Sequence, residues 1–268
     1  MNINLKFLLL GTSLSLIPTL TYAQCTTTPD CAAMGYKETT NKGGCLKCPT
    51  GNGWYCPQPK EEKAVLGECT GYAKNCSIGQ ILNSDGTCSS DKVSGKTPLG
   101  IVVAIKDNCG YAMTENPIER YIKWSTEEVN TGAFQSSNWQ DAIKDFDVSG
   151  NMTKIIQSGN STTYPAAYAA MNYAPSAALT SKGKWMLPTA GILNSLYTNL
   201  NAINNTISKL GGTQLKGEDE HIWSSSEYSR YGVWVLSLST STYGGGVYAG
   251  SKYSSSNVSD VVRPVLAF

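Results

Sequence analysis

The only histidine of the chain lies in the stretch with the strongest potential for acid or base chemistry. His221 follows Glu218, Asp219 and Glu220, and a histidine beside carboxylates can transfer protons. No Ser/His/Asp spacing and no glycine-rich phosphate loop accompanies this group. Acidic residues before a strand are usually a solvated turn. We therefore assign no catalytic residues and predict that the protein is not an enzyme.

The cysteines form a second group with chemical potential, because they can form disulfides or bind zinc. Cys45 and Cys48 have the spacing of zinc ligands, but a second CxxC is lacking and the only histidine is distant. We predict a disulfide framework made in an oxidising compartment, with its pairing open. The odd number leaves at least one thiol unpaired within a monomer, and Cys109 is our candidate for it, or for a tether between two parts of the chain. The disulfide candidates are Cys25, Cys31, Cys45, Cys48, Cys56, Cys69, Cys76, Cys88 and Cys109.

The segment from Ser224 to Asp260 has the composition of a recognition surface. Ser, Tyr, Gly and Thr make up 24 of its 37 residues. Tyrosine offers a large, stiff, amphipathic contact area, and serine and glycine adapt around it. The alternative is a set of edge strands and loops kept polar for solubility, which would not require so many tyrosines. The predicted ligand contacts are Tyr228, Arg230, Tyr231, Tyr243, Tyr248, Lys252, Tyr253 and Asn257.

Strands are expected to hold this segment. Trp234, Leu236 and Leu238 alternate with smaller residues, which is the period of a strand with one face buried and the other partly wet. The last eight residues predict another strand, and Trp223 would cap a third. Both tryptophans occupy strand positions that suit burial.

Three further elements are predicted before this segment. Residues 97–105 are β-branched and apolar, as in a strand. Residues 164–173 form an alanine-rich helix with a proline near its first turn. A second helix runs from the N-cap Thr189 to Gly211, with apolar residues at steps of three and four. Two helices and a β-rich end indicate an α+β fold with an antiparallel sheet.

The chain divides into three parts by composition. Residues 1–23 carry Lys6, an apolar run and small residues up to Ala23, the layout of a cleaved signal peptide that is too short for a transmembrane anchor. Lipid attachment at Cys25 is disfavoured, because Gln24 stands where such sites need a small residue. Residues 24–94 predict a Cys-rich stalk or small modules stabilised by cross-links, and residues 95–268 predict an independent domain.

The near-neutral charge balance shows no excess of basic residues that would bind a polyanion. Lys and Arg number 21 against 20 Asp and Glu, so we expect no nucleic-acid partner. The predicted signal peptide indicates that the protein is secreted or lies at the cell surface, and we expect no transmembrane anchor.

Four separated motifs resemble a known family. They are Trp185-Met186-Leu187-Pro188-Thr189-Ala190-Gly191, Trp223-Ser224-Ser225-Ser226-Glu227-Tyr228, Val233-Trp234 and Val262-Arg263-Pro264-Val265. In this order they resemble the C-type-lectin-fold domains of the bacterial collagen-like adhesin C-terminal type, near the formylglycine-generating-enzyme branch. The resemblance implies a C-type-lectin-like domain in which Trp223, Trp234 and Arg263 are structural and a loop-rich sheet region binds the ligand. Arg263 is expected to pair with a carboxylate such as Glu227.

The resemblance leaves three functional hypotheses. Formylglycine-generating relatives work through cysteines, whereas here the lectin-like part has only Cys109. Calcium-dependent relatives carry Glu-Pro-Asn or Gln-Pro-Asp with Trp-Asn-Asp, and this chain has Glu115-Asn116-Pro117 without Trp-Asn-Asp. We therefore predict no metal and no cofactor, with calcium, which needs several oxygens, left open. The favoured function is adhesin-like binding of a protein or glycan on another cell or surface, with retroelement diversification of the segment as a sharper hypothesis and a structural surface protein as the alternative.

Overall fold

The computed structural model describes residues 66–69, 71–175, 184–216, 220–239, 245–253 and 259–268, and the strand pairs 46–47 and 54–55. The chain forms two compact units, Met1–Glu61 and Glu62–Phe268. In the first unit, β1 (Leu46–Lys47) pairs antiparallel with β2 (Trp54–Tyr55). The predicted signal peptide and Cys25, Cys31, Cys45, Cys48 and Cys56 lie outside the described residues.

A six-stranded antiparallel sheet forms one layer of the second unit. Its longest strand, β5, confirms the strand predicted at residues 97–105. In spatial order the strands are β4 (Cys88–Ser89), β3 (Ile81–Asn83), β5 (Pro98–Lys106), β6 (Cys109–Met113), β13 (Val265–Ala267) and β8 (Trp185–Met186).

Part of the segment that we expected to be a separate stalk belongs to this sheet. The compact unit begins at Glu62 rather than at residue 95, because β3 pairs with β5 and buries Leu82 completely. A 3-10 helix, Tyr72–Asn75, precedes it. Two disulfides, Cys69–Cys109 and Cys76–Cys88, hold this part. Cys109 is therefore paired rather than free, and it joins β6 to the start of the unit.

A five-stranded sheet forms a second layer. In spatial order its strands are β11 (Gly246–Ser251), β10 (Gly232–Ser237), β9 (Glu220–Glu227), β12 (Ser259–Val262) and β7 (Glu119–Arg120). All neighbours are antiparallel except β9 and β12. The single strand predicted for the last eight residues is wrong: β12 and β13 lie in different sheets and are separated by Arg263 and Pro264. Pro264 lacks an N–H and interrupts a ladder.

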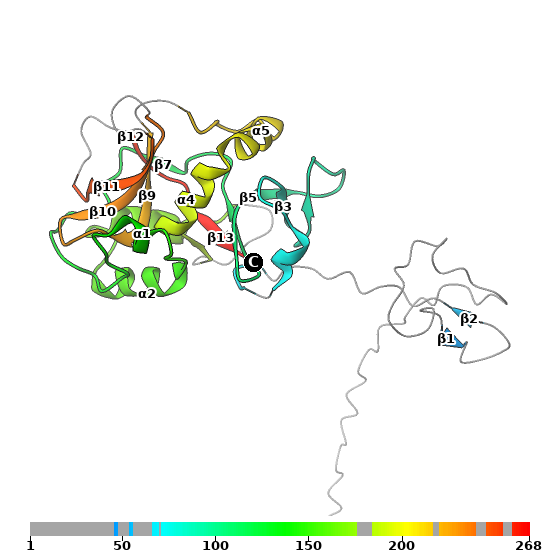
Figure 1. Cartoon of the computed structure of the whole chain (residues 1–268), viewed down its shortest axis with the longest axis horizontal. Coiled ribbons are helices and arrows are strands. Elements are labelled where there is room, and N and C mark those ends of the chain that lie inside the picture. The colour runs from blue at the N-terminus through cyan, green and yellow to red at the C-terminus, as the bar shows by residue number, and fades with distance from the viewer. Residues whose placement is uncertain are drawn as a thin grey trace, which may run out of the picture. The chain divides into compact units, whose positions relative to one another are not determined.

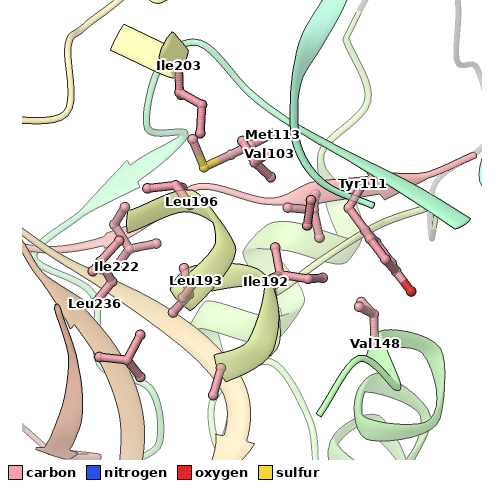
Figure 2. Packing of buried hydrophobic residues seen from close by; sticks show 14 of the residues in the cluster. Val103, Tyr111, Met113, Val148, Ile192, Leu193, Leu196, Ile203, Ile222 and Leu236 are labelled. Carbon is pink, nitrogen blue, oxygen red and sulfur yellow. The ribbon is translucent and has the colours of Figure 1, made fainter. Parts of the chain in front are cut away.

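The helix α4 (Ala190–Thr198) packs against strands of both sheets (Figure 1). Figure 2 shows its Leu193 and Leu196 among buried side chains that include Val103 of β5 and Leu236 of β10. The other helices are α1 (Trp139–Ala142), α2 (Val148–Ser158), α3 (Pro165–Asn172) and α5 (Leu200–Leu210). The main core thus lies between the two sheets, with α4 inside it.

The predicted helix boundaries are partly right. The helix expected at residues 164–173 is α3, and the Thr189 side chain caps α4 by accepting a hydrogen bond from the Ile192 N–H. The single helix expected up to Gly211 is instead two helices, interrupted at Asn199. The Asn199 amide donates to the Ser195 carbonyl, and asparagine side chains that bond the backbone in this way compete with helix continuation.

The strand β10 is buried along its whole length, so the expected wet face does not exist. Trp234 and Leu236 pack in the core with α4, whereas Val233 and Val235 pack in a second cluster with Trp223 and residues of α2 and α3. The fold is mixed α+β with antiparallel sheets, as expected. No helix in the described ranges has the length and apolarity needed to cross a bilayer.

Candidate binding surface

A buried ion pair lies at one end of the five-stranded sheet. Glu227 ends β9 and Lys252 follows β11, and the Lys252 Nζ to Glu227 Oε1 distance is 2.5 Å with both side chains 0% exposed. The Lys252 Nζ also donates to the Val129 carbonyl at 2.8 Å and lies 4.6 Å from the centre of the Trp124 ring. Burial lowers the pKa of Lys252, and Glu227 opposes that shift.

The same ion pair fixes the segment of residues 125–131 on the sheet. The Thr131 N–H donates to both Glu227 carboxylate oxygens at 3.2 Å, and the Ser125 N–H donates to the Lys252 carbonyl at 3.2 Å. With the Val129 contact, three points of this segment are tied to Lys252 or Glu227. We call Lys252, Glu227 and their contacts to residues 125–131 the clamp.

This geometry corrects two sequence predictions. Lys252 was expected to contact ligand, but it is fully buried. Glu227 was expected to pair with Arg263, but its carboxylate pairs with Lys252. Arg263 is fully buried and donates to the Glu115 carbonyl at 3.1 Å and to the Thr213 carbonyl at 2.8 Å. The arginine therefore ties two loops together.

Two Ser-basic-Tyr tripeptides meet beside the clamp. The Ser229 hydroxyl accepts hydrogen bonds from the Tyr231 and Gly232 N–H groups at 3.1 Å, and the Ser251 hydroxyl accepts from the Tyr253 N–H at 3.2 Å. Gly232 and Ser251 are paired residues of β10 and β11. Tyr231 and Tyr253 therefore emerge from neighbouring turns that have similar local geometry.

The side chains at this corner combine aromatic rings with charges of both signs. Tyr231 is 53% exposed, and the Arg230 guanidinium lies 4.8 Å from its ring centre. Partial burial raises the pKa of Tyr253, the carboxylates of Glu128 and Glu127 raise it further, and Arg230 opposes them. Tyr253 thus lies within electrostatic reach of the other four groups, and we call the five side chains the Tyr231 surface: Glu127, Glu128, Arg230, Tyr231 and Tyr253.

The remaining predicted contacts divide between the core and the parts outside the described residues. Tyr228 is half-buried and packs edge-on against Trp234 with ring centres 5.4 Å apart. Tyr248 is half-buried, and its hydroxyl is 2.8 Å from His221 Nε2. Tyr243 and Asn257 lie outside the described residues. Of the eight predicted contacts, Arg230, Tyr231 and Tyr253 come together in the Tyr231 surface.

The tryptophans expected in the scaffold are buried and hydrogen-bonded. The Trp223 Nε1 donates to the Ile122 carbonyl at 2.8 Å, and the Trp234 Nε1 donates to the Ser136 carbonyl at 2.9 Å. Trp124 was not predicted, although it is buried, donates to the Ser224 carbonyl at 2.7 Å and covers Lys252. No periodic pattern surrounds Trp124 in the sequence, so only its residue type could have pointed to it.

His221 belongs to a buried polar group that joins three strands. Its Nδ1 lies 3.3 Å from the Asp260 Oδ1 on β12, and its Nε2 contacts Tyr248 on β11. Glu218 and Asp219, the neighbours that we considered for proton transfer, are outside the described residues. The contacts that are described link β9, β11 and β12.

Acidic side chains also line a cavity of about 560 Å³ next to α1 and α2. Asp145 is buried there and accepts hydrogen bonds from the Ser226 hydroxyl at 2.6 Å and the Asn151 amide at 2.8 Å. Within the ranges that the structure describes, no three His, Cys, Asp or Glu side chains converge as metal ligands. The Asp145 contacts serve to connect α2 to β9.

Comparison with known proteins shows only a likeness of fold. No protein-family model and no curated protein sequence matches the chain. The chain is similar to the crystal structure of a fimbrial protein from Bacteroides ovatus ATCC 8483, with a TM-score of 0.50 and 14% identity over 72% of this chain and 48% of that one. The chain thus spans about half the length of that protein.

Proposed function

We propose that the protein is a secreted or surface-associated, adhesin-like binding protein that recognises a protein or glycan through the Tyr231 surface without a metal ion. The observation that carries this proposal is the convergence of Tyr231, Tyr253 and Arg230 at one corner, held by two serine-bonded turns. Tyrosine and arginine are among the residue types enriched at the positions that contribute most energy to recognition. Pre-organised turns reduce the entropy lost on binding.

The clamp supports this proposal because its buried ion pair positions residues 125–131 beside Tyr253. A buried Lys–Glu pair is weak evidence for stability, since well-packed apolar residues often serve as well. Here the pair holds residues 125–131, which carry Glu127 and Glu128, next to Tyr253. We assign the clamp the role of fixing one side of the binding surface.

We base the proposed fold family, extracellular location and non-enzymatic role on the sequence motifs, the disulfides and the fold comparison. The C-type-lectin-like identity of the second unit is supported by its mixed fold and by the burial of Trp223, Trp234 and Arg263. The extracellular, adhesin-like role is supported by two disulfides and by the fold likeness to a protein described as fimbrial. A non-enzymatic role is supported by the Cys69–Cys109 disulfide, which leaves Cys109 without a thiol for formylglycine-type chemistry.

The test is binding of the full chain, made under oxidising conditions, to a glycan array and to immobilised extracellular-matrix proteins. The variant Y231S/Y253S should lose binding at least tenfold, in the presence or absence of EDTA. Tyr121 is a matched control because it is 65% exposed and lies outside the surface. The variant Y121N should bind as the unaltered chain does, since asparagine tolerates its positive φ of 57°.

Three other outcomes would contradict the proposal. Loss of binding on adding EDTA would indicate a metal-dependent lectin. Equal loss in Y121N and Y231S/Y253S would place the site elsewhere. Absence of binding by a folded chain across both panels would favour the alternative, a structural surface protein without a specific ligand.

A further inference from the structure

The strand β11 is unlike the other sheet edges in the second unit. The two sheets described in the second unit have four outer strands, and β4, β8 and β7 are two residues long, whereas β11 is six. Short strands, charges and prolines are the usual protection of a sheet edge against pairing with another chain. The β11 sequence, Gly-Val-Tyr-Ala-Gly-Ser, contains no charge and no proline.

The register of β10 and β11 shows which backbone groups of β11 point outward. The Lys252 N–H donates to the Tyr231 carbonyl at 3.1 Å, which places these two residues at a hydrogen-bonded position of the β10–β11 ladder. Because hydrogen-bonded and non-hydrogen-bonded pairs alternate in antiparallel sheets, Val247, Ala249 and Ser251 direct their N–H and C=O groups away from β10. No hydrogen bond joins these outward groups to another described residue.

We propose that β11 pairs with β11 of a second copy of this chain, antiparallel about a twofold axis at Ala249. In this register Ala249 faces Ala249 of the second copy, and Val247 faces Ser251. All three outward residues then find partners, and three pairs with two hydrogen bonds each give about six bonds. A twofold axis uses the same patch on both copies and closes the assembly at a dimer.

The side chains agree with this register. Tyr248 falls opposite Gly250 of the second copy, and the glycine has no side chain that would obstruct the pairing. The Tyr248 ring itself leans across β10 towards His221 of β9 and leaves the outer edge open. Ala249 is exposed, and its small side chain allows the twofold approach. No like charges from β11 oppose each other, because the strand carries none. The dimer would present two Tyr231 surfaces, which raises avidity for a multivalent partner without new contacts to it.

The test is the association state of the full chain by sedimentation equilibrium, beside the variants A249P and A249S. Proline removes the outward N–H of Ala249 and leaves the ladder to β10 intact, because proline is tolerated at an outward edge position. We expect concentration-dependent dimers for the unaltered chain and for A249S, and association weakened about tenfold or more for A249P. Melting temperatures of the three proteins check that folding is preserved.

Amide exchange supplies a second reading at residue resolution. At low concentration the amides of Tyr248 and Gly250 should exchange slowly and those of Val247, Ala249 and Ser251 rapidly. At high concentration the latter three should become protected. Two results would overturn the proposal: a chain that stays monomeric at all concentrations, or an A249P variant that associates as tightly as the unaltered chain. A monomeric chain would indicate instead that β11 pairs with an extended segment of another protein.

Discussion

Lys252 and Glu227 form a fully buried ion pair, 2.5 Å between Nζ and Oε1, that connects the ends of β11 and β9. The two residues lie at the ends of strands that are not adjacent in the sheet, because β10 separates them. The two residues also form hydrogen bonds with Ser125, Val129 and Thr131 of the segment of residues 125–131. A change at Lys252 should therefore affect stability and the Tyr231 surface together.

The first prediction concerns this pair. Replacing Lys252 by Met leaves the Glu227 carboxylate buried without its cation, which should cost about 3–5 kcal/mol in the free energy of unfolding. The double variant K252M/E227L removes both charges and should be more stable than the single variant. Urea unfolding measures both. If the free energy of unfolding of K252M lay within about 1 kcal/mol of that of the unaltered chain, the Lys252–Glu227 pair would not be buried in solution.

The second prediction concerns acid stability. Burial tends to raise the pKa of Asp85, but hydrogen bonds from Thr87 and Lys96 outweigh it and lower the pKa from 3.8 to about 2. Because the folded pKa lies below the unfolded value, the carboxylate stabilises the fold at neutral pH, and this contribution is lost as the pH falls from about 4 towards 2. The contribution is about 2 kcal/mol at most.

Urea unfolding of D85N across pH 2–7 checks this prediction. The variant should be less stable than the unaltered chain at pH 7 and equal to it near pH 2. Asp91 provides a control, since it pairs with Lys209 at 2.6 Å but is 73% exposed. The stability of D91N should stay within about 0.5 kcal/mol of the unaltered chain at every pH. A constant deficit in D85N down to pH 2 would contradict the assignment.

The third prediction compares the two disulfides of the described part of the second unit. Cys69–Cys109 joins residues 40 apart and Cys76–Cys88 joins residues 12 apart. Because the longer loop removes more entropy from the unfolded chain, C69S/C109S should lose about 1 kcal/mol more than C76S/C88S. Calorimetric melting of the two double variants makes the comparison. The reverse order would mean that strain or residual unfolded structure dominates.

The fourth prediction compares the stability lost when a buried, a half-buried and an exposed aromatic side chain are each replaced by alanine. W234A should lose about 3–5 kcal/mol, because it empties a buried site and removes the bond to the Ser136 carbonyl. Y231A should stay within about 0.5 kcal/mol, since the ring is largely exposed. Y248A should fall between them, because its hydroxyl contacts His221. Equal stabilities of Y231A and Y248A would contradict the assigned burial.

The sequence alone was sufficient for the elements that depend on local pattern. The period of two in β10, the β-branched run of β5, the alanine-rich α3 and the Thr189 cap of α4 each follow from propensities that act within a few residues. The α+β class follows from their order. The composition of the Tyr-rich segment also predicted three of the five residues of the Tyr231 surface, Arg230, Tyr231 and Tyr253, although it gave no sign of Glu127 and Glu128 or of the burial of Lys252.

The tertiary structure decided everything that depends on partners distant in the chain. Ser229-Arg230-Tyr231 and Ser251-Lys252-Tyr253 have the same local chemistry, yet Arg230 is exposed and Lys252 is buried. The difference arises because Glu227 and the Val129 carbonyl lie beneath Lys252, brought there by strand pairing and by a segment more than 120 residues earlier. Local pattern cannot report such a contact, because it is set by the register of the sheet and by the path of the chain across it.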